Sequence, residues 1–157
     1  MKSNGEDNLS EFNNFYDFNG NGHSPLFVVK IENLQNGLTV SRIYDDVIQE
    51  VLIHMGIPSN TVGYSYLVKA LQLISENQEY LNQGTGYLYC DIAKSCNSTS
   101  ACVERNIRHA IEAAFKCGNT DFIHDILGEK IDITKGIPTN TQFLSGVFYY
   151  IRSIKSH

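Results

Sequence analysis

The stretch that decides the fold is Asp91-Ile-Ala-Lys-Ser-Cys-Asn-Ser-Thr-Ser-Ala-Cys-Val-Glu-Arg-Asn-Ile-Arg-His-Ala-Ile-Glu112. Its spacing indicates a helix, a tight turn and a second helix. Asn97 stands where the turn needs a left-handed backbone, which asparagine tolerates better than most residues. A serine or threonine at positions 98–100 can cap the following helix, and Glu104 lies near its positive N-terminal end. The stretch therefore predicts a helix-turn-helix whose second helix covers residues 99–117.

Hydrophobic residues recur along this second helix at the spacing of one helical face. At about 100° per residue, the apolar side comprises Val103, Ile107, Ala110, Ile111 and Ala114. The opposite side comprises Ala101, Cys102, Arg105, Arg108, His109 and Glu112. We expect the first face to pack against the domain and the second to remain open to a ligand.

Two interpretations fit the open face. In a helix-turn-helix this face of the second helix enters the major groove of DNA, where arginine grips guanine or holds phosphate. Arg105 and Arg108 are the candidates for those contacts. However, an ordinary amphipathic helix with a solvated charged face produces the same pattern and is its commoner origin. Periodicity alone does not separate the two.

Composition sets the main objection to DNA binding. The chain of 157 residues suits one domain of ordinary size, and its 42% hydrophobic content is enough for a core. The formal net charge of −5 disfavours non-specific attraction to nucleic acid, because phosphate contacts supply most of that affinity. The acidic residues Glu6, Asp7, Glu11 and Asp17 all lie near the N-terminus, and residues 91–116 are close to neutral. Their location weakens the objection, since local charge governs the approach to a groove.

The rest of the chain divides at about residue 40. Residues 1–40 are read as a polar tail rich in Asn, Gly, Asp and Glu. Near its end, the β-branched and aromatic run 25–31, the Asn36-Gly37 turn signal and residues 38–42 favour a small β-hairpin. Beyond it the periodicity is helical, and we expect an all-α domain of about six helices over residues 41–157.

Local start and stop signals place the boundaries of these helices. The first helix of the domain is expected to stop at Gly56-Ile57-Pro58, and the second to begin at a cap formed by Ser59 or Asn60. A short link then leads into the helix-turn-helix. The last helix is expected to begin at a cap formed by Thr139 or Asn140.

The cysteines do not have the spacing of a metal site. The four residues, Cys90, Cys96, Cys102 and Cys117, include no C-x-x-C pair and lack histidines at zinc-finger spacing. We therefore expect reduced thiols, with no metal and no cofactor. Cys96 is predicted at the buried end of the first motif helix, and Cys102 on the outward face of the second.

Catalytic and membrane signals are both weak in this sequence. There is no glycine-rich phosphate loop and no nucleophile beside a base, and the histidines are scattered along the chain. No apolar run approaches the roughly 20 residues needed to span a bilayer, and the N-terminus lacks the apolar stretch of a signal peptide. The sequence predicts a cytoplasmic protein that is not an enzyme.

Several stretches together resemble one protein family, in its order and spacing. They are Gly56-Ile-Pro-Ser-Asn-Thr-Val-Gly-Tyr-Ser-Tyr-Leu67, Tyr89-Cys-Asp-Ile-Ala-Lys94, Val103-Glu-Arg-Asn-Ile-Arg-His-Ala-Ile-Glu112, Gly118-Asn119 and Thr134-Lys-Gly-Ile-Pro-Thr-Asn140. They are similar to the C-terminal effector domain of stage zero sporulation protein A, the master regulator of endospore formation. The similarity runs from about Tyr44 to about Ile151, and no single short motif carries it.

The resemblance implies an all-helical domain whose second motif helix reads a short box in double-stranded DNA. It also implies pairing of two copies, as a homodimer or in tandem on repeated boxes, and contact with RNA polymerase. The matching positions for DNA contact are Glu104, Arg105, Arg108 and His109, with Lys94 and Lys135 at phosphates. The predicted site is completed by Ser98, Ala101 and Cys102.

This chain departs from the family pattern at several positions. The family has a basic residue where this chain has Cys102, a loss that could cost about 1 to 3 kcal/mol of discrimination at one base pair. Ser95 stands where lysine is usual, and Asn106 where alanine is usual. The family's regulators also carry a phosphorylated receiver domain ahead of the effector, and the roughly 40 residues before the first helix are too few for one.

Two functions follow from these observations. The first is a sequence-specific transcriptional regulator that reads the major groove with the helix at 99–117. The alternative is a receiver-less interaction module that modulates or antagonises the full-length sporulation regulator. The acidic net charge, the cysteine at position 102 and the aromatic residues of the tail motivate the alternative. Salt dependence separates the two, because DNA binding weakens steeply as salt rises and binding to a protein need not.

Overall fold

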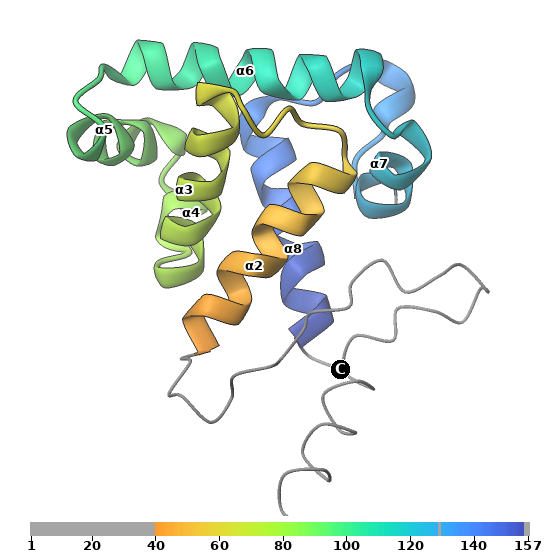
Figure 1. The fold of residues 1–157 in the computed structure, drawn as a ribbon, viewed down its shortest axis with the longest axis horizontal. Coiled ribbons are helices and arrows are strands. Elements are labelled where there is room, and N and C mark those ends of the chain that lie inside the picture. Colours follow the sequence, from red (N-terminus) through yellow and green to blue (C-terminus); the bar gives the residue numbers. More distant parts are fainter. Residues whose placement is uncertain (1–39, 129, 156–157) are drawn as a thin grey trace, which may run out of the picture.

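A computed structural model describes residues 40–128 and 130–155, which fold into helices (Figure 1). In order along the chain they are α2 Val40–His54, α3 Val62–Glu76, α4 Glu79–Asn82, α5 Thr85–Ser95, α6 Ser100–Cys117, α7 Thr120–Leu127, the 3-10 helix η2 Ile133–Lys135 and α8 Asn140–Lys155. This part of the chain contains no strand. The predicted all-α domain of about six helices is confirmed, and the additional helix is the single turn α4 in the expected link.

The predicted hairpin and tail lie mostly outside the described residues. Only the end of the second predicted strand, residues 40–42, is described, and it forms the first turn of α2. Strand was therefore the wrong prediction for these three residues. They precede a run of side chains buried at helical spacing, Tyr44, Val47, Ile48 and Val51, whose packing outweighs local strand propensity.

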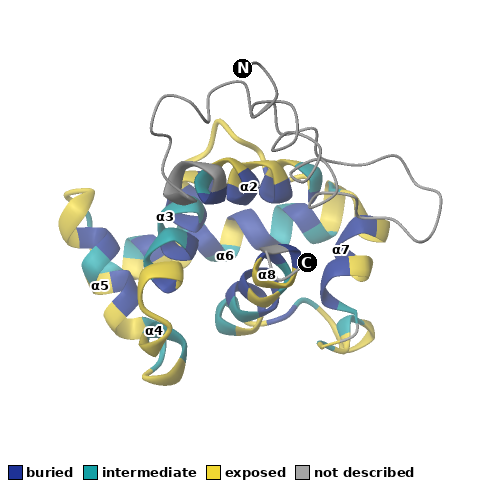
Figure 2. Cartoon of the chain, turned by 90° about the horizontal axis from the view of Figure 1, so that it is seen from below, coloured by how far each residue is buried: buried dark blue, intermediate teal, exposed yellow. Residues whose placement is uncertain are grey.

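The helix α6 lies across one end of the other helices (Figure 1). It packs on α3, α5, α7 and α8. Buried residues follow the inner sides of the helices and exposed residues the outer sides (Figure 2). Because a fully buried apolar side chain contributes about 1.5–3 kcal/mol, this packing fixes the position of α6 against the core.

Two glycines bring the backbone of other elements against α6. A Cβ added at Gly63 of α3 would lie 2.4 Å from the carbonyl oxygen of Asn106 and 2.8 Å from the Cβ of Ala110. A Cβ added at Gly118, directly after α6, would lie 2.3 Å from the carbonyl oxygen of Met55. Only glycine permits such approaches, so the helix is held closely near its middle and at its C-terminal end.

Capping residues begin α3 and α8. The hydroxyl of Thr61 accepts a hydrogen bond from the backbone N–H of Tyr64 at 3.2 Å, so the predicted caps Ser59 and Asn60 are wrong. The cap comes later because the Thr61 N–H and hydroxyl both donate to the carbonyl of Pro58, which extends the turn.

At α8 the predicted cap Thr139 is confirmed. Its hydroxyl accepts from the N–H of Gln142 at 3.1 Å, and the side chain of Gln142 accepts from the N–H of Thr139 at 3.0 Å. This reciprocal pair is a capping box. No helix in residues 40–128 or 130–155 combines the length and the apolar character needed to cross a membrane.

Candidate nucleic-acid interface

The predicted turn between α5 and α6 is present with the expected geometry. Asn97 has a φ of 52°, in the left-handed region. The N–H of Ser98 donates to the carbonyl of Ala93 at 2.9 Å, which closes the turn. The hydroxyl of Thr99 then accepts from the N–H of Cys102 at 3.2 Å and caps α6. These contacts confirm the helix-turn-helix.

The two faces of α6 are also as predicted. All five residues assigned to the apolar face are buried: Val103, Ile107, Ala110, Ile111 and Ala114. On the opposite face the side chains are exposed or partly exposed: Ala101, Cys102, Arg105, Arg108, His109 and Glu112. The helix therefore presents one continuous outward surface while its other side is held in the core.

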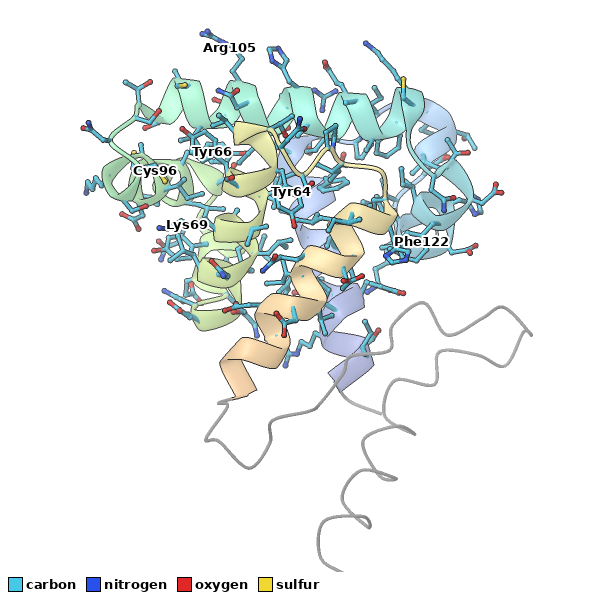
Figure 3. All side chains as sticks on the ribbon, viewed as in Figure 1. Tyr64, Tyr66, Lys69, Cys96, Arg105 and Phe122 are labelled. Carbon is cyan, nitrogen blue, oxygen red and sulfur yellow. The ribbon has the colours of Figure 1, made fainter. Side chains whose placement is uncertain are left out.

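Arg105 presents an exposed guanidinium on this surface. It is exposed and forms no hydrogen bond or ion pair with any residue in the described part of the chain. Figure 3 shows its side chain projecting from the outer side of α6, away from the other helices. His109, one helical turn further on, is exposed as well. Both side chains can reach a ligand without breaking an internal contact.

Arg108 is placed differently although it lies on the same side of the helix. Its Nε donates to Glu112 Oε1 at 3.0 Å, and its Nη1 donates to the carbonyl oxygen of Pro138 at 2.6 Å. The side chain is 34% exposed. A guanidinium has five N–H donors, and these two contacts do not use all of them. Contact between Arg108 and DNA therefore remains a prediction. Its present contacts join α6 to the segment ahead of α8.

Two residues that depart from the family pattern, Cys102 and Asn106, are in contact. The side-chain amide of Asn106 donates to the carbonyl oxygen of Cys102 at 2.8 Å and to its sulfur at 3.3 Å. Cys102 remains partly exposed at the beginning of the outward face. Ala101 and the side chain of Glu104 are exposed beside it.

The remaining predicted cations lie on neighbouring segments. Lys94 of α5 is 81% exposed, with its Nζ 4.0 Å from Asp91 Oδ1. Lys135 of η2 is 83% exposed, with its Nζ 3.3 Å from Asp132 Oδ2. The hydroxyl of Thr134 and the ammonium of Lys135 hold the pKa of Asp132 below its ordinary value. Exposed surface pairs of this kind are weak because solvent screens them, so either lysine can exchange its carboxylate for a phosphate.

The start of α8 is tied to both helices of the motif, which sequence reasoning missed. The side-chain amide of Asn140 donates to the carbonyl of Glu104 at 3.2 Å, and Arg108 reaches Pro138. The hydroxyls of Thr85, at the start of α5, and Thr141 lie 3.2 Å apart. These contacts join residues that are 30 to 56 positions apart, and no local signal in the sequence indicated them.

The prediction for Cys96 was wrong. Cys96 is exposed at the C-terminal cap of α5, where the helix ends and the turn toward α6 begins (Figure 3). The four cysteines are free, and Cys102 is the only one of them on α6 that lies near the turn. Within residues 40–128 and 130–155, no three metal-ligating side chains come together.

Residues 48–151 match the model of the family described as "Sporulation initiation factor Spo0A C terminal". The chain belongs to this family. The matched range contains the whole helix-turn-helix and runs from within α2 to within α8. The Spo0A C-terminal domain is a sporulation-related DNA-binding domain that serves transcription regulation, and its family is not a family of enzymes.

Membership in the Spo0A C-terminal family bears on the two interpretations of the open face of α6. A solvated amphipathic helix and a DNA-reading helix share the same periodicity. The family, however, is one of DNA-binding effector domains. The predicted resemblance is confirmed by the match, and α6 is the second helix of the motif in a domain of that class.

Proposed function

We propose that this protein is a sequence-specific transcriptional regulator that reads the major groove with α6. The observation that carries the proposal is the exposed guanidinium of Arg105, which has no partner within residues 40–128 and 130–155, on a helix whose opposite face is wholly buried. A reading helix must present its side chains rigidly, because base recognition depends on bidentate geometry. The close backbone contacts at Gly63 and Gly118 supply that rigidity.

The side chains of the N-terminal half of α6 would contact base edges. Arg105 can form two hydrogen bonds to O6 and N7 of guanine, and Glu104 can accept a hydrogen bond from the N4 amino group of cytosine. Cys102, one turn before Arg105 on the same side, would face a neighbouring base pair. His109 and Arg108 lie further along the helix and would reach the edge of the groove or its backbone.

Phosphate contacts would position the domain without specifying sequence. Lys94 and Lys135 are the two candidates, since each is more than four-fifths exposed and weakly paired. Ser98 lies in the turn between the two motif helices and would contact the backbone near the start of α6. The family resemblance further leads us to expect tandem or homodimeric pairing on repeated boxes and contact with RNA polymerase.

Fluorescence anisotropy of the full chain on labelled duplexes tests the proposal. A duplex selected from random DNA is compared with a scrambled duplex over a salt series. We expect tight binding to the selected duplex only, with an affinity that falls steeply with salt because each phosphate contact contributes about −0.9 to the slope. Equal affinity for both duplexes, independent of salt, would contradict the proposal.

Thiol modification locates the contact on the protein. Cys102 and Cys117 lie near opposite ends of α6, about 22 Å apart along its axis, and both are free. DNA should slow the reaction of Cys102 with N-ethylmaleimide and leave Cys117 unchanged. If DNA protects Cys117 and not Cys102, the N-terminal half of α6 is not the reading element.

An interaction module that modulates the full-length regulator is the second candidate. It is favoured by the net charge of −5 and by large apolar side chains exposed on the described surface, Ile53, Val62, Tyr87 and Tyr149. This candidate predicts no selected DNA sequence, and binding to a protein partner that changes little with salt. The anisotropy series above therefore also decides between the two candidates.

A further inference from the structure

Cys102 lies beside Arg105 on the outward face of α6, and if the proposed function holds, it would face a base pair. Cys102 is the third residue of α6 and Arg105 the sixth, so they lie on one side of the helix. Their separation along the helix axis is about 4.5 Å, whereas base pairs are spaced about 3.4 Å apart. The pair that Cys102 faces is therefore within two steps of the pair that Arg105 faces.

The contact with Asn106 defines what Cys102 presents to the groove. The amide of Asn106 donates to the carbonyl and to the sulfur of Cys102, and this occupies the weak acceptor capacity of the thiol. Asn106 is itself only partly exposed, so the pair forms a small surface without charge. A free cysteine in such a setting behaves as a small hydrophobe.

A small apolar surface matches one feature of the major groove. Guanine offers acceptors there, to which the S–H of Cys102 is only a weak donor, whereas thymine offers its C5-methyl group to apolar side chains. We infer that Cys102, oriented by Asn106, is a specificity-determining residue that selects thymine within two base pairs of the guanine read by Arg105.

Removing the thymine methyl group tests this inference directly. The selected duplex is remade with uracil in place of each thymine in turn, which deletes the methyl group and leaves base pairing intact. Four proteins are compared by anisotropy: the wild type, Cys102→Ser, Arg105→Ala and the control Cys117→Ser on the same helix. A fifth, Cys102→Arg, is tested for its preferred base at the same pair.

We expect one thymine near the Arg105 guanine at which uracil weakens wild-type binding about fourfold, the value of one buried methylene-sized group. Cys117→Ser should show the same loss, and Cys102→Ser should show little or none. Cys102→Arg should change the preferred base at that pair from thymine to guanine.

The outcomes separate this inference from the proposed function. If binding is selective and depends on Arg105, but uracil has no effect at any thymine within two steps, the inference is wrong and the function stands. It is also wrong if Cys102→Ser keeps the full uracil effect. If no sequence is selected and Arg105→Ala changes nothing, the proposed function itself has failed.

Discussion

Arg105 and Arg108 lie three residues apart on one side of α6, and replacing each by alanine should have different consequences. Arg105 is exposed and unpaired within the described chain, whereas Arg108 donates hydrogen bonds to Glu112 and to the carbonyl of Pro138. We expect Arg105→Ala to weaken DNA binding without changing stability. Arg108→Ala should lower the free energy of unfolding, because it releases the segment ahead of α8 from α6.

The size of the stability loss can be estimated from the two contacts of Arg108. Both side chains of the pair with Glu112 are 34% exposed, so solvent screening limits that pair to about 0.5 kcal/mol. The 2.6 Å hydrogen bond to Pro138 has a charged donor and should contribute about 1–1.5 kcal/mol. Together they predict a loss of about 1.5–2 kcal/mol, or a Tm lower by about 6–8 °C. Arg105→Ala should remain within about 0.5 kcal/mol of the wild type.

The affinity for DNA, unlike the stability, should fall in Arg105→Ala. One bidentate contact between arginine and guanine is worth about 1–3 kcal/mol, so Arg105→Ala should bind the selected duplex about 5- to 150-fold more weakly. Urea unfolding followed by circular dichroism measures the stabilities, and anisotropy measures the affinities. The assigned roles are refuted if Arg105→Ala is destabilised as much as Arg108→Ala, or if Arg108→Ala unfolds like the wild type.

Three further predictions concern phosphate contact, backbone packing and pH. Lys94→Ala and Lys135→Ala should each make the slope of log affinity against log salt shallower by about 0.9. Each should lose the same affinity on the selected and the scrambled duplex. A loss of affinity confined to the selected duplex would instead indicate a base contact. Gly63→Ala should lower the free energy of unfolding by about 1–3 kcal/mol, because its Cβ would lie 2.4 Å from a backbone oxygen of α6. The control is Gly86→Ala, in α5 with open space around it, which should be neutral or stabilising by up to about 1 kcal/mol. Equal urea midpoints for the two variants would disprove the close contact between Gly63 and α6. Burial raises the pKa of Tyr44 from 10.0 to about 12, so the native state holds the phenol proton more tightly than the unfolded chain does. The contribution of Tyr44 to stability should be level below pH 10 and should be lost as the pH rises from 10 to 12. Burial also raises the pKa of Tyr150, so Tyr44 is measured by the difference between wild type and Tyr44→Phe in how far the urea midpoint falls from pH 9 to pH 11. An unchanged fall in Tyr44→Phe would show that Tyr44 does not contribute.

Local signals were sufficient for the motif and for its orientation. The left-handed Asn97, the Thr99 cap and the burial of one face of α6 all depend on residues within about 20 positions of each other. The same kind of reasoning was wrong at Cys96, because burial at the end of a helix depends on where the chain turns next. It was also wrong at the start of α3, where the hydrogen bonds of Thr61 to Pro58 delay the cap.

The sequence by itself determined the all-helical class, the helix-turn-helix and the set of side chains that face outward, since periodicity and capping are short-range properties. Only the tertiary structure decided which outward side chains are available. Arg105 and Arg108 are equivalent in the helical pattern, and a carbonyl 30 residues away distinguishes them. The pairing of Asn140 with Glu104, which lie 36 positions apart, depends on side-chain positions that the pattern does not contain. A hydrogen bond is decided by where two groups meet in space, and packing between distant segments sets that position.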